Sequence, residues 1–130
     1  MQVFSFYIQY WEEIFEELLS IEVIVFQNLM AKKKFKEIIA QPGTAVLVDF
    51  YADWCAPCQT MTPILEEVVD QLEGKIRLYK LNVDKNPQAS LQFGVRSIPH
   101  YILFKNGKIL WRKGGYMTKR ELLQSLKGFI

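Results

Sequence analysis

The chain has 130 residues, the length of one domain at roughly 100–200 residues per domain, and its 50% hydrophobic and 23% charged residues exclude a disordered or collagen-like chain. The net charge of +2 is too small to indicate a protein that binds nucleic acid or a membrane surface. No apolar run approaches the ~18 residues of a membrane-spanning helix, so the sequence predicts no membrane span.

The charge is divided unevenly along the chain. Residues 1–30 contain five glutamates and no lysine or arginine, whereas residues 31–130 contain all 16 basic residues. We therefore expect an N-terminal extension over residues 1–30, followed by a folded domain over residues 31–130.

The extension is predicted to form an amphipathic helix with an acidic outer face. Its large apolar residues recur at helical spacing, with four glutamates on the opposite side: Tyr7, Tyr10, Trp11, Ile14, Phe15, Leu18 and Leu19. The β-branched run over residues 21–26 is predicted to be a first strand. A secretory signal is not expected, because the segment lacks a basic start, an uninterrupted apolar stretch and a small-residue cleavage site.

Three hypotheses remain for what the extension does. The helix packs on its own domain or on a second copy of the chain, which would make a homo-oligomer through residues 1–30. A membrane-surface helix is disfavoured, because such helices carry lysine and arginine on the polar face. Alternatively, translation starts at Met30 and the extension is absent from the native protein.

The rest of the chain alternates strand and helix patterns. Helices are predicted over residues 32–40, 58–72, 86–93 and 119–129, and strands over residues 45–51, 76–83, 101–104 and 109–112. Asn106-Gly107 predicts a tight hairpin, and Thr118 with Glu121 forms a capping box. This order predicts an α/β fold: a central sheet with parallel strands at its centre, an antiparallel hairpin at one edge, and helices on both faces.

The two cysteines lie between a buried strand and a long helix, as Trp54-Cys55-Ala56-Pro57-Cys58. The first sulfur of such a pair lies at a helix N-terminus, where unpaired N–H groups favour a thiolate. A thiolate attacks disulfides, so we expect Cys55 to attack and Cys58 to resolve the mixed disulfide. Half of a zinc site is the alternative, but His100 is the only other soft ligand that the sequence offers. Two buried structural cysteines are a further alternative, which Trp54 and Pro57 on a turn disfavour.

Five motifs in this order resemble the thioredoxin family over residues 31–130. They are Val48-Asp49-Phe50-Tyr51-Ala52-Asp53-Trp54-Cys55-Ala56-Pro57-Cys58, Met61-Thr62-Pro63-Ile64-Leu65-Glu66-Glu67, Lys80-Leu81-Asn82-Val83-Asp84, Gly94-Val95-Arg96-Ser97-Ile98-Pro99 and Phe104-Lys105-Asn106-Gly107. The resemblance implies a thioredoxin fold, with a mixed sheet flanked by helices and preceded here by the helical extension.

The resemblance also implies roles for individual residues. Asp49 matches the family's buried acid, whose pKa burial should raise and which would accept the Cys58 proton through a water. A structural acid paired with Lys80 is the alternative, and the two roles are compatible. Lys80 matches the lysine beside that acid, and Pro99 the cis-proline that faces the sulfurs. With Ile98, Pro99 would line the edge that pairs with an extended substrate. The expected docking surface also includes Trp54, Ala56, Pro57, Gly94 and Gly115.

The implied activity is that of a cytoplasmic protein-disulfide reductase, a general reductant in electron transport and cell redox homeostasis. Its expected partners are disulfide-containing proteins and a thioredoxin reductase, and neither a cofactor nor a metal is expected. An oxidant or isomerase of an oxidising compartment is the competing enzyme, and a subunit that only lends its surface is the third hypothesis. Two positions depart from the family pattern: Ala56 replaces the usual glycine and His100 the usual threonine. His100 either tunes the dithiol or is a hydrogen-bonded histidine facing the sheet.

Overall fold

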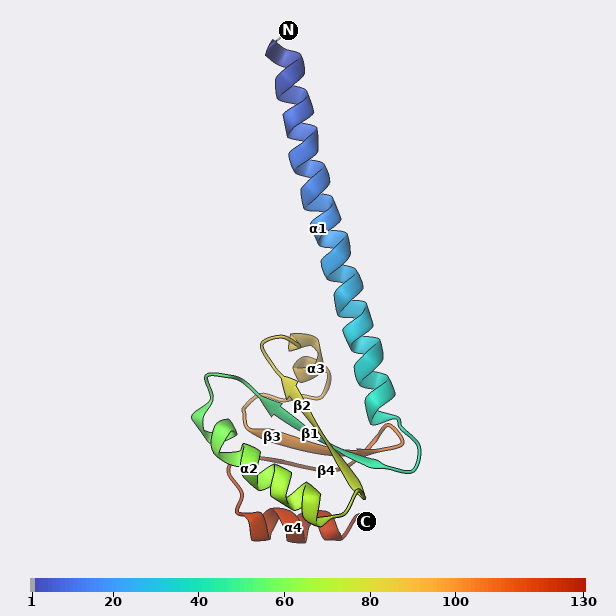
Figure 1. Ribbon diagram of the computed structural model, residues 1–130, viewed down its shortest axis with the longest axis vertical. Helices are drawn as coiled ribbons and strands as arrows, with labels where there is room; N and C mark the ends of the chain where they lie inside the picture. Colours follow the sequence, from blue (N-terminus) through green and yellow to red (C-terminus); the bar gives the residue numbers. More distant parts are fainter. Residues whose placement is uncertain (1) are drawn as a thin grey trace. The chain divides into compact units, whose positions relative to one another are not determined.

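The computed structural model describes residues 2–130, with side chains for residues 7–30 and 32–130. Its elements, in chain order, are α1 (Gln2–Ile39), β1 (Ala45–Tyr51), α2 (Ala56–Gln71), β2 (Ile76–Asn82), α3 (Pro87–Gln92), β3 (His100–Lys105), β4 (Lys108–Gly114) and α4 (Lys119–Lys127) (Figure 1). The chain divides into two compact units between Phe35 and Lys36. Among the described residues, none of the helices is long and apolar enough to cross a membrane.

The N-terminal segment forms one long helix, which differs from two of the predictions. The strand predicted over residues 21–26 is wrong, because these residues belong to α1, which also absorbs the separate helix predicted over residues 32–40. No glycine or proline interrupts residues 2–39, and β-branched residues reduce helix stability only slightly. A strand would also need a partner for its backbone groups, whereas a helix bonds internally.

The sheet has four strands in the order β2-β1-β3-β4. β1 and β2 are parallel, β1 and β3 are antiparallel, and β3 and β4 form the antiparallel hairpin at one edge. The mixed sheet and its hairpin edge are therefore as predicted. The expectation of a parallel centre is wrong, because the central pair β1–β3 is antiparallel and the parallel pair lies at the β2 edge.

Helices cover both faces of the sheet. Side chains alternate along β1, so Ala45 and Leu47 face α2 and α4, which lie together on one side (Figure 1). Val46, Val48 and Phe50 point to the other face and are also buried. On that face Phe93, the residue that ends α3, packs edge-on against Phe104 with ring centroids 5.2 Å apart. Burial on both faces explains why β1 is almost continuously apolar.

Local signals in the sequence fix the ends of several elements. Asn106 and Gly107 both have positive φ, at 52° and 77°, as the tight hairpin between β3 and β4 requires. Thr118 caps α4 by accepting the Glu121 N–H, while the Glu121 carboxylate accepts the Thr118 N–H, which completes the predicted capping box. These contacts define the β3–β4 hairpin and the start of α4 in the domain that carries the two cysteines.

Candidate active site

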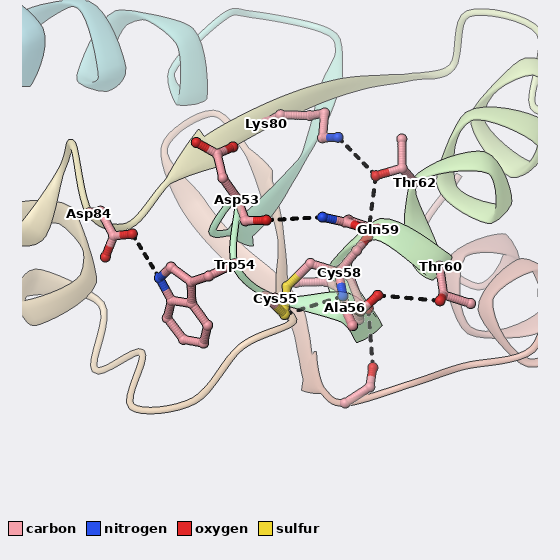
Figure 2. The surroundings of a disulfide bond; sticks show 12 residues. Asp53, Trp54, Cys55, Ala56, Cys58, Gln59, Thr60, Thr62, Lys80 and Asp84 are labelled. Atoms are coloured by element: carbon pink, nitrogen blue, oxygen red, sulfur yellow. Dashed lines mark hydrogen bonds between the residues drawn. A yellow bond between two sulfur atoms is a disulfide. The ribbon is translucent and has the colours of Figure 1, made fainter.

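The cysteine pair lies where β1 ends and α2 begins. Cys55 is the N-cap of α2 and forms a disulfide with Cys58, with Cα atoms 5.3 Å apart. The Cys58 N–H also donates to the Cys55 Sγ at 3.2 Å (Figure 2). In the reduced protein the same donor and the helix dipole would stabilise a Cys55 thiolate, because both favour negative charge at this position.

Both cysteines belong to a small buried cluster. Cys55 and Cys58 are 4% and 2% exposed and pack with Ala52, Tyr51, Val83 and Ile98. Trp54, by contrast, is 71% exposed, and its Nε1 donates to the Asp84 carboxylate at 2.9 Å (Figure 2). The cluster therefore shields the disulfide from solvent, and the neighbouring Trp54 is exposed with its ring oriented by Asp84.

Asp49 is a fully buried carboxylate in β1. Neither of its oxygens has a hydrogen-bond partner among the described residues. Burial raises the pKa of Asp49 from its ordinary value of 3.8 to about 6, and the Lys80 charge partly offsets this rise. Its neighbours on the adjacent strands are Lys80 of β2 and Tyr101 of β3. The expected rise in pKa on burial is thus confirmed.

Lys80 lies beside Asp49 without contacting its carboxylate. Its Nζ donates to Thr62 Oγ1 at 2.9 Å (Figure 2). The same Nζ lies 4.8 Å from the centroid of the Tyr51 ring. The lysine thus acts on Asp49 through its charge, at a distance.

The peptide between Ile98 and Pro99 is cis, as the resemblance implies. The Pro99 carbonyl accepts the Gly115 N–H at 2.9 Å, and the Tyr101 hydroxyl donates to the Gly115 carbonyl at 3.1 Å. Gly115 has φ +88°, a conformation that side chains disfavour. A backbone hydrogen bond thus connects Pro99 and Gly115. Gly94 lies on an exposed turn after α3, with φ +64°, and its N–H donates to the Leu91 carbonyl instead.

Comparison with known proteins agrees with this geometry. The family model named Thioredoxin matches residues 26–128. The chain belongs to the thioredoxin family. Among its relatives, the thioredoxin of Rickettsia bellii is 44% identical over 98 residues, covering 75% of this chain and 93% of the relative. Thioredoxin 1 of Nostoc sp. is 42% identical over 93 residues, covering 72% of this chain and 87% of the relative. With its close cysteine pair, this member of the thioredoxin family is a thiol–disulfide oxidoreductase and acts as a protein-disulfide reductase.

A hollow of about 360 Å³ lies beside Trp54 in this thioredoxin domain, and it shares Val83 and Ile98 with the cluster around the disulfide. Its lining combines apolar side chains with Arg96 and two serines: Trp54, Val83, Pro87, Ser90, Val95, Arg96, Ser97 and Ile98. Trp54 and Ile98, both predicted to bind substrate, therefore border one recess.

His100, which departs from the thioredoxin pattern, contacts Phe50 and Arg112 and sits on the sheet. The Arg112 Nε donates to His100 Nε2 at 3.2 Å, and the ring lies edge-on to Phe50 with centroids 6.4 Å apart. Burial and the Arg112 charge both lower the pKa of His100. His100 is therefore a hydrogen-bonded side chain of the sheet.

In the described part of the chain, no three His, Cys, Asp or Glu side chains gather to hold a metal ion. Two residues of the site were missed by the sequence analysis. Asp84 orients Trp54 across 30 positions of sequence, and Thr62 holds Lys80 across 18. Both occur in the motifs that carry the resemblance, but their contacts arise only when β2 pairs with β1 beside α2.

Proposed function

We propose that the protein is a general reductant of protein disulfides, with Cys55 as the attacking residue and Cys58 as the resolving residue. The Cys55 thiolate attacks one sulfur of a target disulfide, which forms a mixed disulfide and releases the other target sulfur as a thiolate. The Cys58 thiolate then attacks the Cys55 sulfur. This step closes the Cys55–Cys58 disulfide, releases the second target sulfur, and leaves the target reduced by two electrons.

The position of Cys55 is the observation that carries this assignment. Cys55 precedes the first turn of α2, and its sulfur accepts an N–H from within that turn. Cys58 lies inside the helix, so the unpaired N–H groups of the helix start act mainly on Cys55. The lower thiol pKa expected at Cys55 favours it as the attacking group.

Asp49 is proposed as the acceptor of the Cys58 proton, through a water. Its raised pKa of about 6 leaves it largely ionised at pH 7, and its carboxylate oxygens have no hydrogen-bond partner among the described residues that would compete for the proton. Lys80 is proposed to limit the rise in that pKa by its charge. A purely structural role for Asp49 is less well supported, because a carboxylate without partners does not stabilise the surrounding sheet.

The docking surface is proposed to combine a backbone edge with apolar contacts. Ile98 and Pro99 would pair with an extended segment of the target. Side chains of the target would contact the surrounding positions, which are Trp54, Ala56, Pro57, Gly94 and Gly115. The hollow beside Trp54 supports this arrangement, because it is largely apolar and shares Val83 and Ile98 with the cluster around the disulfide.

A thioredoxin reductase is proposed to regenerate the dithiol, which places the protein in electron transport and cell redox homeostasis in the cytoplasm. Both cysteines form the redox pair, so the chain has no structural disulfide of the kind found in oxidising compartments. Residues 31–130 are proposed as the redox domain, and residues 1–30 as an association segment that joins copies of the chain. Large exposed side chains along α1, including Tyr7, Trp11 and Phe26, support the latter.

An equilibrium titration of the Cys55–Cys58 pair against glutathione tests the reductant assignment. A reduction potential well below that of the glutathione pool is expected. A potential near or above the pool would instead identify an oxidant or isomerase.

A further inference from the structure

Thr62 is the one polar side chain of α2 that contacts Lys80 in the part of the chain that the structure describes. It lies one turn after Cys58 in α2, and its hydroxyl donates to the Cys58 carbonyl at 3.2 Å (Figure 2). The same oxygen accepts the Lys80 Nζ at 2.9 Å. The hydroxyl therefore donates one hydrogen bond and accepts another. Neither hydrogen bond takes part in the thiol–disulfide exchange proposed above.

These contacts fix where the positive charge of Lys80 lies. A lysine on an exposed strand position ordinarily keeps a mobile side chain with its ammonium in water. Here the Thr62 hydroxyl and the Tyr51 ring hold the ammonium from two sides. In the described part of the chain no ion pair joins it to Asp49, although the two residues are direct neighbours on β2 and β1.

We propose that Thr62 is a positioning residue for the reduction: its hydroxyl holds the Lys80 ammonium beside Asp49 but out of contact with it. The proton acceptor then feels a fixed positive charge and still keeps its carboxylate unpaired. The proposal rests on the proposed function only where it concerns the rate of mixed-disulfide release. The hydrogen bond between Thr62 and Lys80 is present in the oxidised protein and does not depend on the proposed function.

Few other groups act on Asp49. Tyr101 faces it from β3, with its hydroxyl bonded to the Gly115 carbonyl and its pKa raised by burial and by the Asp49 charge. The two cysteines at the start of α2 do not titrate as a disulfide. Lys80 is therefore the one cation found to act on Asp49 among the described residues, and its position decides how far burial raises the pKa of Asp49.

Replacing Thr62 with valine removes the hydroxyl and keeps the shape. The freed Lys80 ammonium then moves into water, because an exposed lysine gains side-chain entropy and hydration there. Asp49 loses a fixed positive neighbour, so its pKa rises. We expect a rise of about 0.5 units, a modest value because the lysine is exposed and its charge is screened.

The measurement is a ¹³C NMR titration of the Asp49 carboxyl in the oxidised full-length protein, with Asp49→Asn used to assign the signal. Thr62→Val should raise the pKa, and Thr62→Ser, which keeps a hydroxyl, should restore the wild-type value. Thr60→Val is the matched control: the Thr60 hydroxyl also donates to a carbonyl one turn back, that of Ala56 at 3.3 Å, but accepts from no lysine. An unchanged or lowered pKa in Thr62→Val, or an equal rise in Thr60→Val, would overturn the proposal.

A double variant isolates the path through Lys80. Lys80→Met alone should raise the pKa of Asp49, and adding Thr62→Val should raise it no further, because the two changes remove the same interaction. Additive shifts would show that Thr62 acts on Asp49 by another route and would overturn the proposal.

The rate of mixed-disulfide release distinguishes the role of Thr62 from the role of Asp49 as proton acceptor. At pH 6 a rise of about 0.5 units lowers the ionised fraction of Asp49 from about a half to about a quarter, so release of the mixed disulfide should slow about twofold. At pH 8 the two rates should agree. A shifted pKa with an unchanged rate at pH 6 would support the hold of Thr62 on Lys80 and refute Asp49 as the proton acceptor.

Discussion

The buried carboxylate of Asp49 makes a prediction about stability whose sign depends on pH. Its pKa is raised from 3.8 to about 6 in the folded protein, so the folded state binds a proton more tightly than the unfolded chain does. Below pH 3.8 both states are protonated and Asp49 has no net effect. As the pH rises through 3.8 towards 6, the unfolded chain ionises first, and folding loses stability.

The size of this loss follows from the difference between the two pKa values. The difference is about 2 units, and each unit corresponds to about 1.4 kcal/mol, so ionised Asp49 destabilises the fold by about 3 kcal/mol above pH 6. Asp49→Ala removes this term at every pH. The stability of the variant relative to wild type should therefore increase by about 3 kcal/mol between pH 3 and pH 8, whatever constant cost the lost packing of the carboxyl group adds.

Urea unfolding of the oxidised proteins, followed by tryptophan fluorescence across this pH range, measures the change. Because only the pH-dependent part of the difference is used, a cavity at position 49 does not affect the test. A relative stability that stays flat or falls with pH would mean that the carboxylate is well paired in solution, and it would refute the argument from burial.

The same substitution should slow release of the mixed disulfide roughly 10²-fold at pH 7 and leave its formation nearly unchanged. The deficit should shrink towards pH 9, where the Cys58 thiol ionises by itself. Equal slowing of both steps would leave Asp49 with a structural role only.

The remaining predictions concern the cysteines, the tryptophan and the extension. Cys55→Ser should abolish reduction of insulin disulfides, and Cys58→Ser should accumulate mixed disulfides with targets on non-reducing gels; normal turnover by Cys58→Ser would reverse the assignment. Trp54→Phe loses the bond to Asp84 and should raise the KM for a protein target roughly threefold with kcat unchanged, as the loss of one exposed hydrogen bond implies. A chain beginning at Met30 should fold and reduce insulin at about the full-length rate, with any oligomer shifted towards monomer in light scattering; loss of activity in the folded short chain would place the extension at the active site.

Much of the domain could be predicted because its signals are local. The hairpin depends on two adjacent residues that accept positive φ, and the start of α4 depends on a threonine and a glutamate three positions apart. Asp49 was detectable as a charge in an otherwise apolar strand, and burial then dictates the direction of its pKa shift. In the first two cases the deciding interaction joins residues close in sequence, and in the third it is the burial of one side chain.

The errors arose where the deciding interaction is distant or absent. Residues 21–26 have strand-like side chains, but a strand forms only with a partner, and the sequence does not say whether one is available. The antiparallel pairing of β1 with β3 depends on how the connection after α3 returns to the sheet. The contact of Lys80 with Thr62 likewise needs two elements to meet at side-chain resolution.

The two contacts of Lys80 and the isolation of Asp49 form one arrangement. A carboxylate buried alone destabilises the fold and, with no cation nearby, would have a pKa above 6 and be poorly ionised at neutral pH. A full ion pair with lysine would lower the pKa so far that the carboxylate would be a weak base. An ammonium held near the carboxylate, but out of contact, leaves the pKa between these limits, where a base is mostly ionised at pH 7 and still accepts a proton from a thiol. The proposed role of Asp49 as proton acceptor for Cys58 accounts for the stability lost at this position, because an apolar side chain there would suit the sheet better.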